Sequence, residues 1–273
     1  MSPGRLLLVG CGNMGGAMLR RWLASGLDPG TVTVVSPSGR AMPDGVRVVR
    51  SVPPVEEDAF DTVLLALKPQ KLNELRGGPF EAHAPNLLIS ILAGVQEGTL
   101  RSLSPARAVV RAMPNLPVAI GRGVTALHSS SADATAREAA QALMRPLGHV
   151  EWIAEERLFD AVTALAGSGP GFTFRFAEAL ARAGEALGLP GDQSMRLALA
   201  TLEGSAIMAA SADDGPGALA EKVASPGGST REGYNVLDRD EALIKLMRET
   251  LRAAERRNRE MAETARESPI SLN

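Results

Sequence analysis

The stretch Gly10-Cys11-Gly12-Asn13-Met14-Gly15 decides the fold. It has the spacing GxGxxG, follows an apolar run directly, and opens a segment with helical periodicity. In this setting the first glycine allows a tight turn, the second lets backbone N–H groups approach a pyrophosphate, and the third lets helix and strand pack closely. The helix N-terminus adds partial positive charge. The stretch predicts a dinucleotide-binding loop with Gly10, Gly12, Asn13, Met14 and Gly15 as cofactor-binding residues, and an ordinary glycine-rich turn is the alternative.

The segment after the second apolar run indicates which dinucleotide is bound. Sites for NAD carry Asp or Glu about 20 residues after the glycine loop, where the carboxylate binds the ribose 2′-hydroxyl. This chain has Ser36-Pro37-Ser38-Gly39-Arg40 there, with no acidic residue. Hydroxyl groups and a guanidinium suit a 2′-phosphate. We therefore expect Ser36 and Arg40 to bind NADPH, with NADH less favoured; the alternative for Arg40 is a solvated loop charge.

The first half of the chain alternates short apolar runs with polar helical segments. The runs are β-branched and continuous, which is typical of parallel strands covered on both faces. The predicted strands are 6–9, 32–35, 46–49, 63–67, 87–91 and 108–111, and 123–127 and 150–153 are predicted edge strands with a helix at 132–144 between them. This pattern predicts an α/β fold, with an N-terminal Rossmann-like, doubly wound and mostly parallel sheet.

Strand patterns end near Leu158, and Ala- and Leu-rich helical patterns follow. The predicted helices are 172–187, 192–210, 219–223 and 241–265. We therefore expect a dinucleotide-binding domain at 1–157 and an all-helical domain at 158–273. Aromatic residues make up only 3% of the chain, so a helical domain of this size has a thin core that a second subunit would help to bury.

Composition excludes several classes of function. The net charge of −2 gives no attraction to nucleic acid or to an anionic membrane surface. No apolar run approaches the roughly 20 residues that a membrane helix needs. With Cys11 as the single cysteine, no intrachain disulfide can form, and a cytoplasmic protein is expected. The three histidines show no metal-ligand spacing, so no metal site is predicted.

Five further segments accompany the glycine loop in chain order. They are Ala66-Leu67-Lys68-Pro69-Gln70, Ser90-Ile91-Leu92-Ala93-Gly94, Arg111-Ala112-Met113-Pro114-Asn115-Leu116-Pro117, Gly167-Ser168-Gly169-Pro170 and Ser225-Pro226-Gly227-Gly228-Ser229-Thr230, the last ending in Leu237-Asp238. Together they resemble the pyrroline-5-carboxylate reductase family along nearly the whole chain. The resemblance implies an enzyme that reduces L-1-pyrroline-5-carboxylate to L-proline, in proline biosynthesis, by hydride transfer from NADPH to the cyclic imine. It also implies cofactor contacts from Ala66, Pro69 and Ala93. Asn115 and Lys68 each follow a predicted strand, and ligands bind beyond the carboxyl ends of strands in an open α/β sheet, so both are expected to bind the cofactor, with the substrate as a further possible contact of Asn115. The alternative for Lys68-Pro69 is a plain helix-start turn.

The segment from Ser225 to Thr230 has the composition of an anion-binding turn. Pro226 fixes the entry, and the two glycines allow backbone N–H groups to converge on a carboxylate. A helix-capping turn without a ligand is the alternative. The resemblance implies that Thr230 is catalytic and hydrogen-bonds the imine nitrogen. It further implies that Gly228, Ser229 and Thr230 bind the substrate carboxylate through their backbone, with Ser225 in the same loop.

One position departs from the resemblance. Tyr234, the only tyrosine in the chain, stands where the family has an aliphatic residue. A reductase of another cyclic imino acid therefore stays open. A non-catalytic NADP-binding paralogue is a separate alternative, which an intact glycine loop would also fit. A 3-hydroxy-acid dehydrogenase is a third alternative, but Lys222 and Lys245 do not lie in a matching motif. The resemblance also implies a homodimer or larger homo-oligomer formed through the C-terminal helices.

Overall fold

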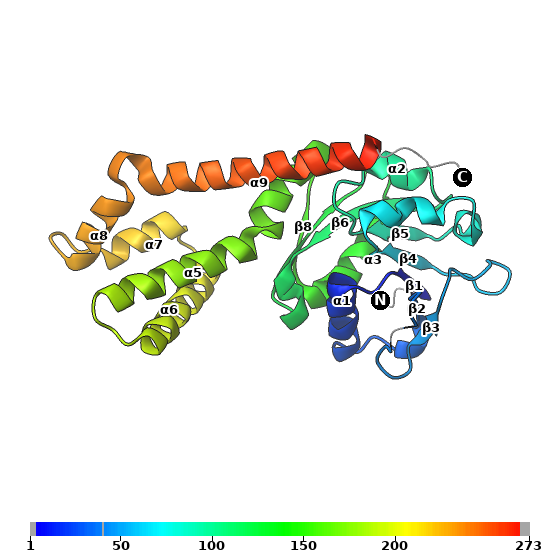
Figure 1. Cartoon of the computed structure of the whole chain (residues 1–273), viewed down its shortest axis with the longest axis horizontal. Helices are drawn as coiled ribbons and strands as arrows, with labels where there is room; N and C mark the ends of the chain where they lie inside the picture. The colour runs from blue at the N-terminus through cyan, green and yellow to red at the C-terminus, as the bar shows by residue number, and fades with distance from the viewer. Residues whose placement is uncertain (1–3, 40, 268–273) are drawn as a thin grey trace. The chain divides into compact units, whose positions relative to one another are not determined.

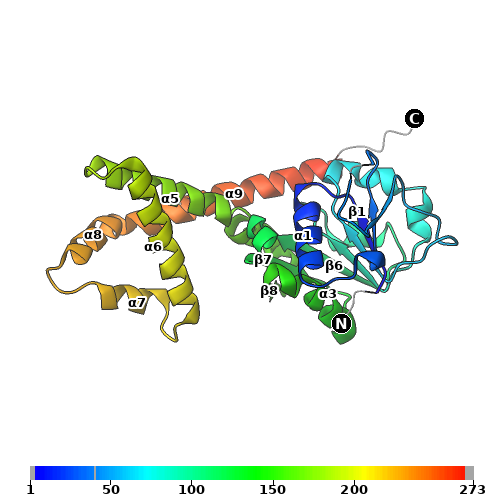
Figure 2. The ribbon, with the colours of Figure 1, turned by 90° about the horizontal axis from the view of Figure 1, so that it is seen from below.

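The computed structural model describes residues 4–39 and 41–267, and two compact units can be separated within it. The first holds the chain up to Ser168 and the segment from Ala254 onward, and the second is Gly169–Ala253. Figure 1 and Figure 2 show their helices and strands. The predicted domain boundary between residues 157 and 158 stays a prediction, because compact units need not be the segments that fold alone.

An eight-stranded sheet runs through the first unit in the order β3-β2-β1-β4-β5-β6-β7-β8. Its strands are β1 (Leu6–Val9), β2 (Val32–Val35), β3 (Arg47–Val49), β4 (Thr62–Leu65), β5 (Leu87–Ser90), β6 (Ala108–Pro114), β7 (Gly123–His128) and β8 (Gly148–Trp152). Every neighbouring pair is parallel except β6 and β7. The expected doubly wound, mostly parallel sheet is confirmed.

The strand order reverses between β1 and β4. The chain winds outward through β2 and β3 on one side of β1, and then through β4 and β5 on the other. In open α/β sheets, ligands bind beyond the carboxyl ends of the strands at such a switch point. The glycine loop lies there, since Gly10 N donates to Val35 O at 3.2 Å and Ala66 N donates to Val9 O at 2.8 Å.

Two details of the sheet differ from the prediction. Strand β6 continues to Pro114 instead of ending at Arg111, because β7 returns antiparallel and pairs with it as far as Thr125. Met113 and Pro114 therefore belong to the strand rather than to the loop after it. Strand β7 was predicted at an edge but lies between β6 and β8, and β8 forms that edge.

Helices α1 (Asn13–Ala24) and α3 (Ala134–Met144) contribute buried side chains to the same hydrophobic cluster as β1, β2 and β4. Trp22 of α1 is 2% exposed, and its indole Nε1 donates to the carbonyl oxygen of Leu143 at 2.7 Å. A second cluster includes Leu72, Phe80 and Leu100, which come from the short helical turns at 69–75 and 79–82 and from α2 (Glu97–Arg101). The sheet is thus covered on both faces, as its apolar strands require.

The second unit is built from helices. These are α5 (Gly169–Ala186), α6 (Gly191–Ser211), α7 (Pro216–Val223), α8 (Ser229–Leu237) and the first part of α9 (Ala242–Glu267). A four-residue connection with Gly188 at φ +98° joins α5 to α6. Ala177, Ala181 and Ala198 are the buried apolar residues of these two helices, and Ser194 Oγ donates to Ala181 O at 2.6 Å. Small side chains allow the two helices to pack closely.

Candidate active site

Each glycine of the loop between β1 and α1 meets a different physical demand. Gly10 has φ +88°, and a Cβ there would lie 2.9 Å from Ala66 O. A Cβ on Gly15 would lie 3.1 Å from the Cβ of Ala66, so helix α1 sits close to the end of β4. A Cβ on Gly12 would meet nothing within 4 Å. Gly12 is the residue before α1, and no side chain among the described residues caps that helix. The first N–H groups of α1 are therefore available to an anion.

A cavity of about 600 Å³ adjoins this loop. It brings together five of the predicted cofactor residues, which are Gly10, Gly12, Ser36, Ala66 and Lys68. The hydroxyl oxygens of Ser36 and Ser38 lie 3.4 Å apart at one side of it. The volume is in the range of small-molecule and cofactor sites. An open glycine, an uncapped helix start and a lining with cationic side chains fit the phosphates of a dinucleotide.

Arg50 also lines this cavity, and sequence reasoning missed it. It follows β3 directly and reaches toward the turn after β2, where a Cβ on Gly39 would lie 3.8 Å from Arg50 Nη2. Lys71, another cation of the lining, pairs with Glu74 at 3.6 Å. The exposed Arg50 guanidinium thus lies near the turn that carries Ser36 and Ser38, where a 2′-phosphate was expected.

The other residues predicted around the loop have separate positions. Asn13 lines a smaller cavity of about 260 Å³ on the α1 side, together with Gly12 and Arg20. Met14 is partly buried and packs against the core. Arg40 lies outside the described residues. The cofactor roles of these three residues stay predictions.

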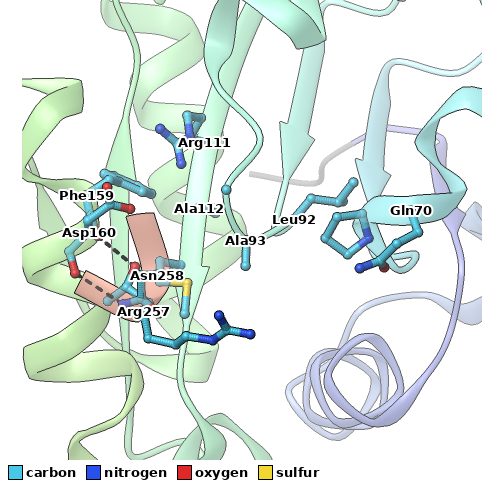
Figure 3. Close-up of a pocket in the computed structure, with 13 residues that line it drawn as sticks. Gln70, Leu92, Ala93, Arg111, Ala112, Phe159, Asp160, Arg257 and Asn258 are labelled. Atoms are coloured by element: carbon cyan, nitrogen blue, oxygen red, sulfur yellow. Dashed lines mark hydrogen bonds between the residues drawn. The ribbon is translucent and has the colours of Figure 1, made fainter. Parts of the chain in front are cut away.

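A second cavity, of about 430 Å³, lies beyond the carboxyl ends of β5 and β6 (Figure 3). Pro69 and Ala93 line it, as do Arg111, Phe159 and Asp160. The Arg111 side chain is 8% exposed, donates to Glu156 Oε1 at 2.8 Å, and lies 4.5 Å from the centre of the Phe159 ring. Because the Arg111 guanidinium is buried and already paired with Glu156, it holds the wall of the cavity in place and is not available to pair with a ligand.

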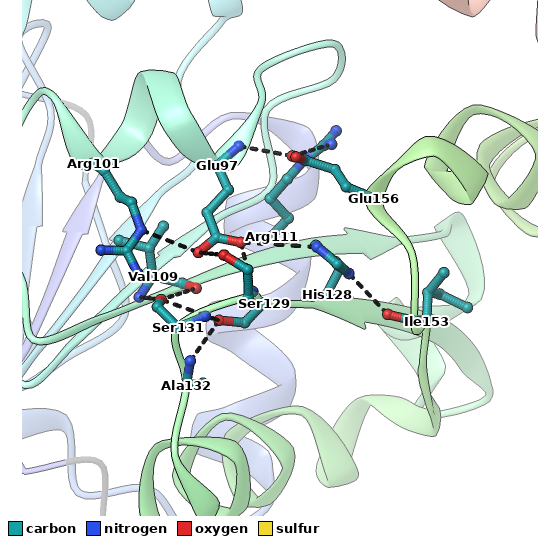
Figure 4. A network of polar contacts seen from close by, with 11 residues as sticks. Glu97, Arg101, Val109, Arg111, His128, Ser129, Ser131, Ala132, Ile153 and Glu156 are labelled. Atoms are coloured by element: carbon teal, nitrogen blue, oxygen red, sulfur yellow. Dashed lines mark hydrogen bonds and ion pairs between the residues drawn. The ribbon is translucent and has the colours of Figure 1, made fainter.

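Behind this wall lies a network of buried polar groups (Figure 4). Glu97 accepts hydrogen bonds from Ser130 N at 2.7 Å, Ser130 Oγ at 2.9 Å and Arg101 Nε at 3.3 Å. Its own backbone N–H donates to Glu156 Oε1 at 2.8 Å. Burial alone would raise the pKa of Glu97, but these hydrogen bonds and one from Ser131 outweigh burial and hold the pKa below its ordinary value. The network fixes the segment after β5 to the segment after β7.

Asn115 was expected to contact a ligand because it follows a strand. Its side chain is committed to backbone groups instead: Nδ2 donates to Ala166 O at 3.0 Å, and Oδ1 accepts from Val124 N at 2.8 Å. Ala166 lies in a π-helical turn, Thr163–Gly167, that follows α4 (Phe159–Val162). Pro170, four residues further on, has no N–H to give to that carbonyl. This geometry favours a structural role for Asn115, and its role at the cofactor stays a prediction.

In the second unit, the predicted substrate residues form a turn and a helix start. Gly228 N donates to Ser225 O at 3.0 Å, and Gly227 between them has φ +69°. Proline followed by glycine at positive φ is typical of a type II turn. Helix α8 begins at Ser229, and no side chain of the described residues caps it. The turn thus presents N–H groups beside the Thr230 hydroxyl, an arrangement that can bind a carboxylate.

Comparison with known proteins decides the family. The chain is 34% identical to a pyrroline-5-carboxylate reductase of Pseudomonas aeruginosa over 96% of this chain and 98% of that protein. It is 36% identical to one of Synechocystis over 94% and 98%. This chain belongs to the pyrroline-5-carboxylate reductase family. Two family models also match, pyrroline-5-carboxylate reductase dimerisation at residues 156–261 and coenzyme F420-dependent NADP oxidoreductase at residues 5–94.

Solved structures of the family agree with the fold. A reductase from Coxiella burnetii has a TM-score of 0.81 and 29% identity, over 95% of this chain and 98% of that one. A pyrroline carboxylate reductase from Plasmodium falciparum, solved with NADP bound, has a TM-score of 0.79 and 25% identity, over 96% and 99%. The predicted resemblance is confirmed along nearly the whole chain. Within the part of this reductase that the structure describes, no group of three or more metal-ligating acidic, His or Cys side chains occurs.

Proposed function

We infer that this chain uses NADPH to reduce the carbon–nitrogen double bond of L-1-pyrroline-5-carboxylate, which gives L-proline. The observation that carries this conclusion is its end-to-end similarity to pyrroline-5-carboxylate reductases at 33–36% identity. The geometry of the glycine loop and of the cavity beside it supports the cofactor part of this proposal, because both fit a dinucleotide. No observation favours another cyclic imino acid or a non-catalytic paralogue.

The cofactor role is assigned to the chain's own groups. The N–H groups at the start of α1 bind the pyrophosphate, because Gly12 leaves them open. Ser36, Ser38 and Arg50 bind the 2′-phosphate, which distinguishes NADPH from NADH. Pro69 and Ala93 border the neighbouring cavity, where the nicotinamide half is proposed to bind.

The substrate role is assigned to the Ser225–Thr230 turn. Its backbone N–H groups at Gly228, Ser229 and Thr230 hold the carboxylate, and the α8 dipole adds to the attraction. The Thr230 hydroxyl oxygen accepts a hydrogen bond from the protonated imine nitrogen and, together with the held carboxylate, orients the ring. When bound, NADPH would supply a hydride for the imine carbon, and the nitrogen would keep the proton it carries as an iminium. The protein therefore works mainly by positioning, and a strong general acid is not required.

The chain forms a homo-oligomer, as the matched dimerisation model indicates. Exposed apolar side chains on α5, α6 and α9 support assembly through the C-terminal helices, among them Phe176, Leu197, Ile207 and Ile244. We propose that the smallest assembly is a homodimer. Each helix of the described residues is too short or too polar to span a membrane. A cytoplasmic location is also a proposal, consistent with a single cysteine.

The test is a steady-state assay with racemic pyrroline-5-carboxylate, following loss of NADPH absorbance and identifying proline as the product. A six-membered cyclic imino acid serves as the competing substrate. We expect turnover with the five-membered ring at a higher kcat/KM. NADPH binding without turnover of any imino acid would reject the enzyme assignment, and a preference for the six-membered ring would reject the substrate.

A further inference from the structure

Two side chains of α8 reach back to the last turn of α7. Arg231 donates to both carboxylate oxygens of Glu221, from Nη1 at 3.2 Å and from Nη2 at 2.6 Å. Tyr234 Oη donates to the carbonyl oxygen of Ala220 at 3.1 Å. The guanidinium carbon of Arg231 lies 5.7 Å from the centre of the Tyr234 ring. We name Glu221, Arg231 and Tyr234 the α7–α8 clamp.

The clamp provides hydrogen-bond donors for backbone carbonyl groups at and just after the C-terminal end of α7. The last four carbonyls of a helix have no partner within it, and Tyr234 binds one of them, at Ala220. Arg231 Nη2 also donates to Ala224 O at 3.3 Å, just after α7 ends. The hydrogen bonds between Arg231 and Glu221 lower the pKa of Glu221 and raise the pKa of Arg231. Both shifts favour the charged forms, so the ion pair is present at neutral pH.

Because the clamp links α7 to α8, it also restricts the conformation of the Ser225–Thr230 turn that connects them. The Ser225–Thr230 turn is held on one side at Ala224, which is 5% exposed, and on the other at Arg231. Joining the ends of so short a segment removes most of its alternative conformations. The N–H groups at the start of α8 and the Thr230 hydroxyl then keep one orientation before substrate arrives. A ligand that meets an ordered site loses less entropy on binding.

We propose that the α7–α8 clamp positions the substrate turn, so that Arg231 and Tyr234 act on the imino acid only through it. The proposal rests on the proposed function, in which that turn binds the substrate. Loss of one clamp contact should loosen the turn and weaken substrate binding, while the glycine loop and NADPH binding stay unaffected. Glu221, Arg231 and Tyr234 are thus positioning residues, not catalytic ones.

The test compares Tyr234→Phe and Glu221→Gln with Asp192→Asn. Tyr234→Phe keeps the ring and removes the hydroxyl, and Glu221→Gln keeps the shape and removes the charge. Asp192→Asn breaks another exposed ion pair of the same unit, to Arg196 at 2.6 Å, far from the turn in sequence. We measure KM for pyrroline-5-carboxylate, KM for NADPH, and hydrogen exchange of the amides at 225–231.

Each clamp variant is expected to raise KM for the imino acid about two- to tenfold, the range for one lost hydrogen bond, with KM for NADPH unchanged. Exchange at 225–231 should become faster, and Asp192→Asn should change neither quantity. Unchanged KM with a lowered melting temperature would show a merely structural contact and overturn the proposal. Failure of the unmodified protein to turn over any imino acid would instead overturn the proposed function, and the clamp proposal with it.

Discussion

Alanine at Gly10 and at Gly12 should separate the folding role of the glycine loop from its binding role. Gly10→Ala puts an L-residue at φ +88°, which costs about 1–2 kcal/mol. Its Cβ would also lie 2.9 Å from backbone atoms of Ala66 and Leu67, directly after β4. Those atoms cannot move without disturbing the sheet. We therefore expect Gly10→Ala to lower the free energy of unfolding by about 2–4 kcal/mol in total.

Gly12→Ala should have the opposite effect, with little loss of stability and a clear loss of NADPH affinity. Gly12 has φ −74°, and its Cβ would meet no atom within 4 Å, so the loss of stability should stay below about 1 kcal/mol. In the proposed cofactor site, the added methyl group would occupy the space through which the pyrophosphate approaches the start of α1. Losing one hydrogen bond to a charged group costs roughly 1.5–3 kcal/mol, so Kd for NADPH should rise by about tenfold to a hundredfold.

The native tryptophans provide the assay. Trp22 lies in α1 and is 2% exposed, and Trp152 lies in β8, so fluorescence in a urea titration reports unfolding of the first unit. Kd for NADPH is measured by titration well below the melting temperature of each variant. The reasoning is refuted if Gly12→Ala destabilises the protein as much as Gly10→Ala does, or if Gly12→Ala binds NADPH as tightly as the unmodified protein.

Three further changes test other parts of the site. Thr230→Ala should lower kcat about tenfold or more at unchanged NADPH affinity, and unaltered turnover would remove Thr230 from the mechanism. Arg50→Gln should raise KM for NADPH about tenfold or more and leave KM for NADH alone, whereas equal effects on both cofactors would contradict a 2′-phosphate contact. Glu97 has a lowered pKa, so its carboxylate stabilises the fold above its unfolded pKa, and this contribution is lost as pH falls through the folded value. Melting temperatures of Glu97→Gln and the unmodified protein should therefore converge below about pH 4.5, and a constant difference would exclude this role.

The sheet was predictable because its strands are buried on both faces. A continuous apolar run such as Val63–Leu65 carries that information locally, and so does the glycine loop that follows β1. The direction of β7 was not predictable in the same way. Parallel and antiparallel strands can have the same hydrophobic pattern. The antiparallel pairing of Met113 with Ala126 depends on a chain reversal near Gly121, which has φ +69°.

Site residues were predictable from the sequence only where a single segment determines both the backbone conformation and the groups that face the ligand. Arg50 was not predicted, because it lies near Ser36 only as a result of the pairing of β3 with β2, and sequence spacing does not reveal that pairing. Asn115 was assigned to a ligand by its place near a strand end, yet a carbonyl 51 residues away accepts its hydrogen bond. Tyr234 stood out as a departure, and its partner in α7 became visible only in three dimensions.

The surroundings of the three histidines are consistent with the catalysis proposed for this reductase. His83 Nε2 pairs with Pro53 O at 2.8 Å, His128 Nδ1 with Ile153 O at 2.9 Å, and His149 Nε2 with Glu151 Oε2 at 3.0 Å. Each imidazole thus has a structural partner, and none lines the cavities described above. A reaction whose substrate already carries its proton needs no such group. On the proposed function, the rate depends on how firmly the turn and the glycine loop hold their ligands, so changes at the clamp and at Gly12 are expected to alter it more than a change at any histidine.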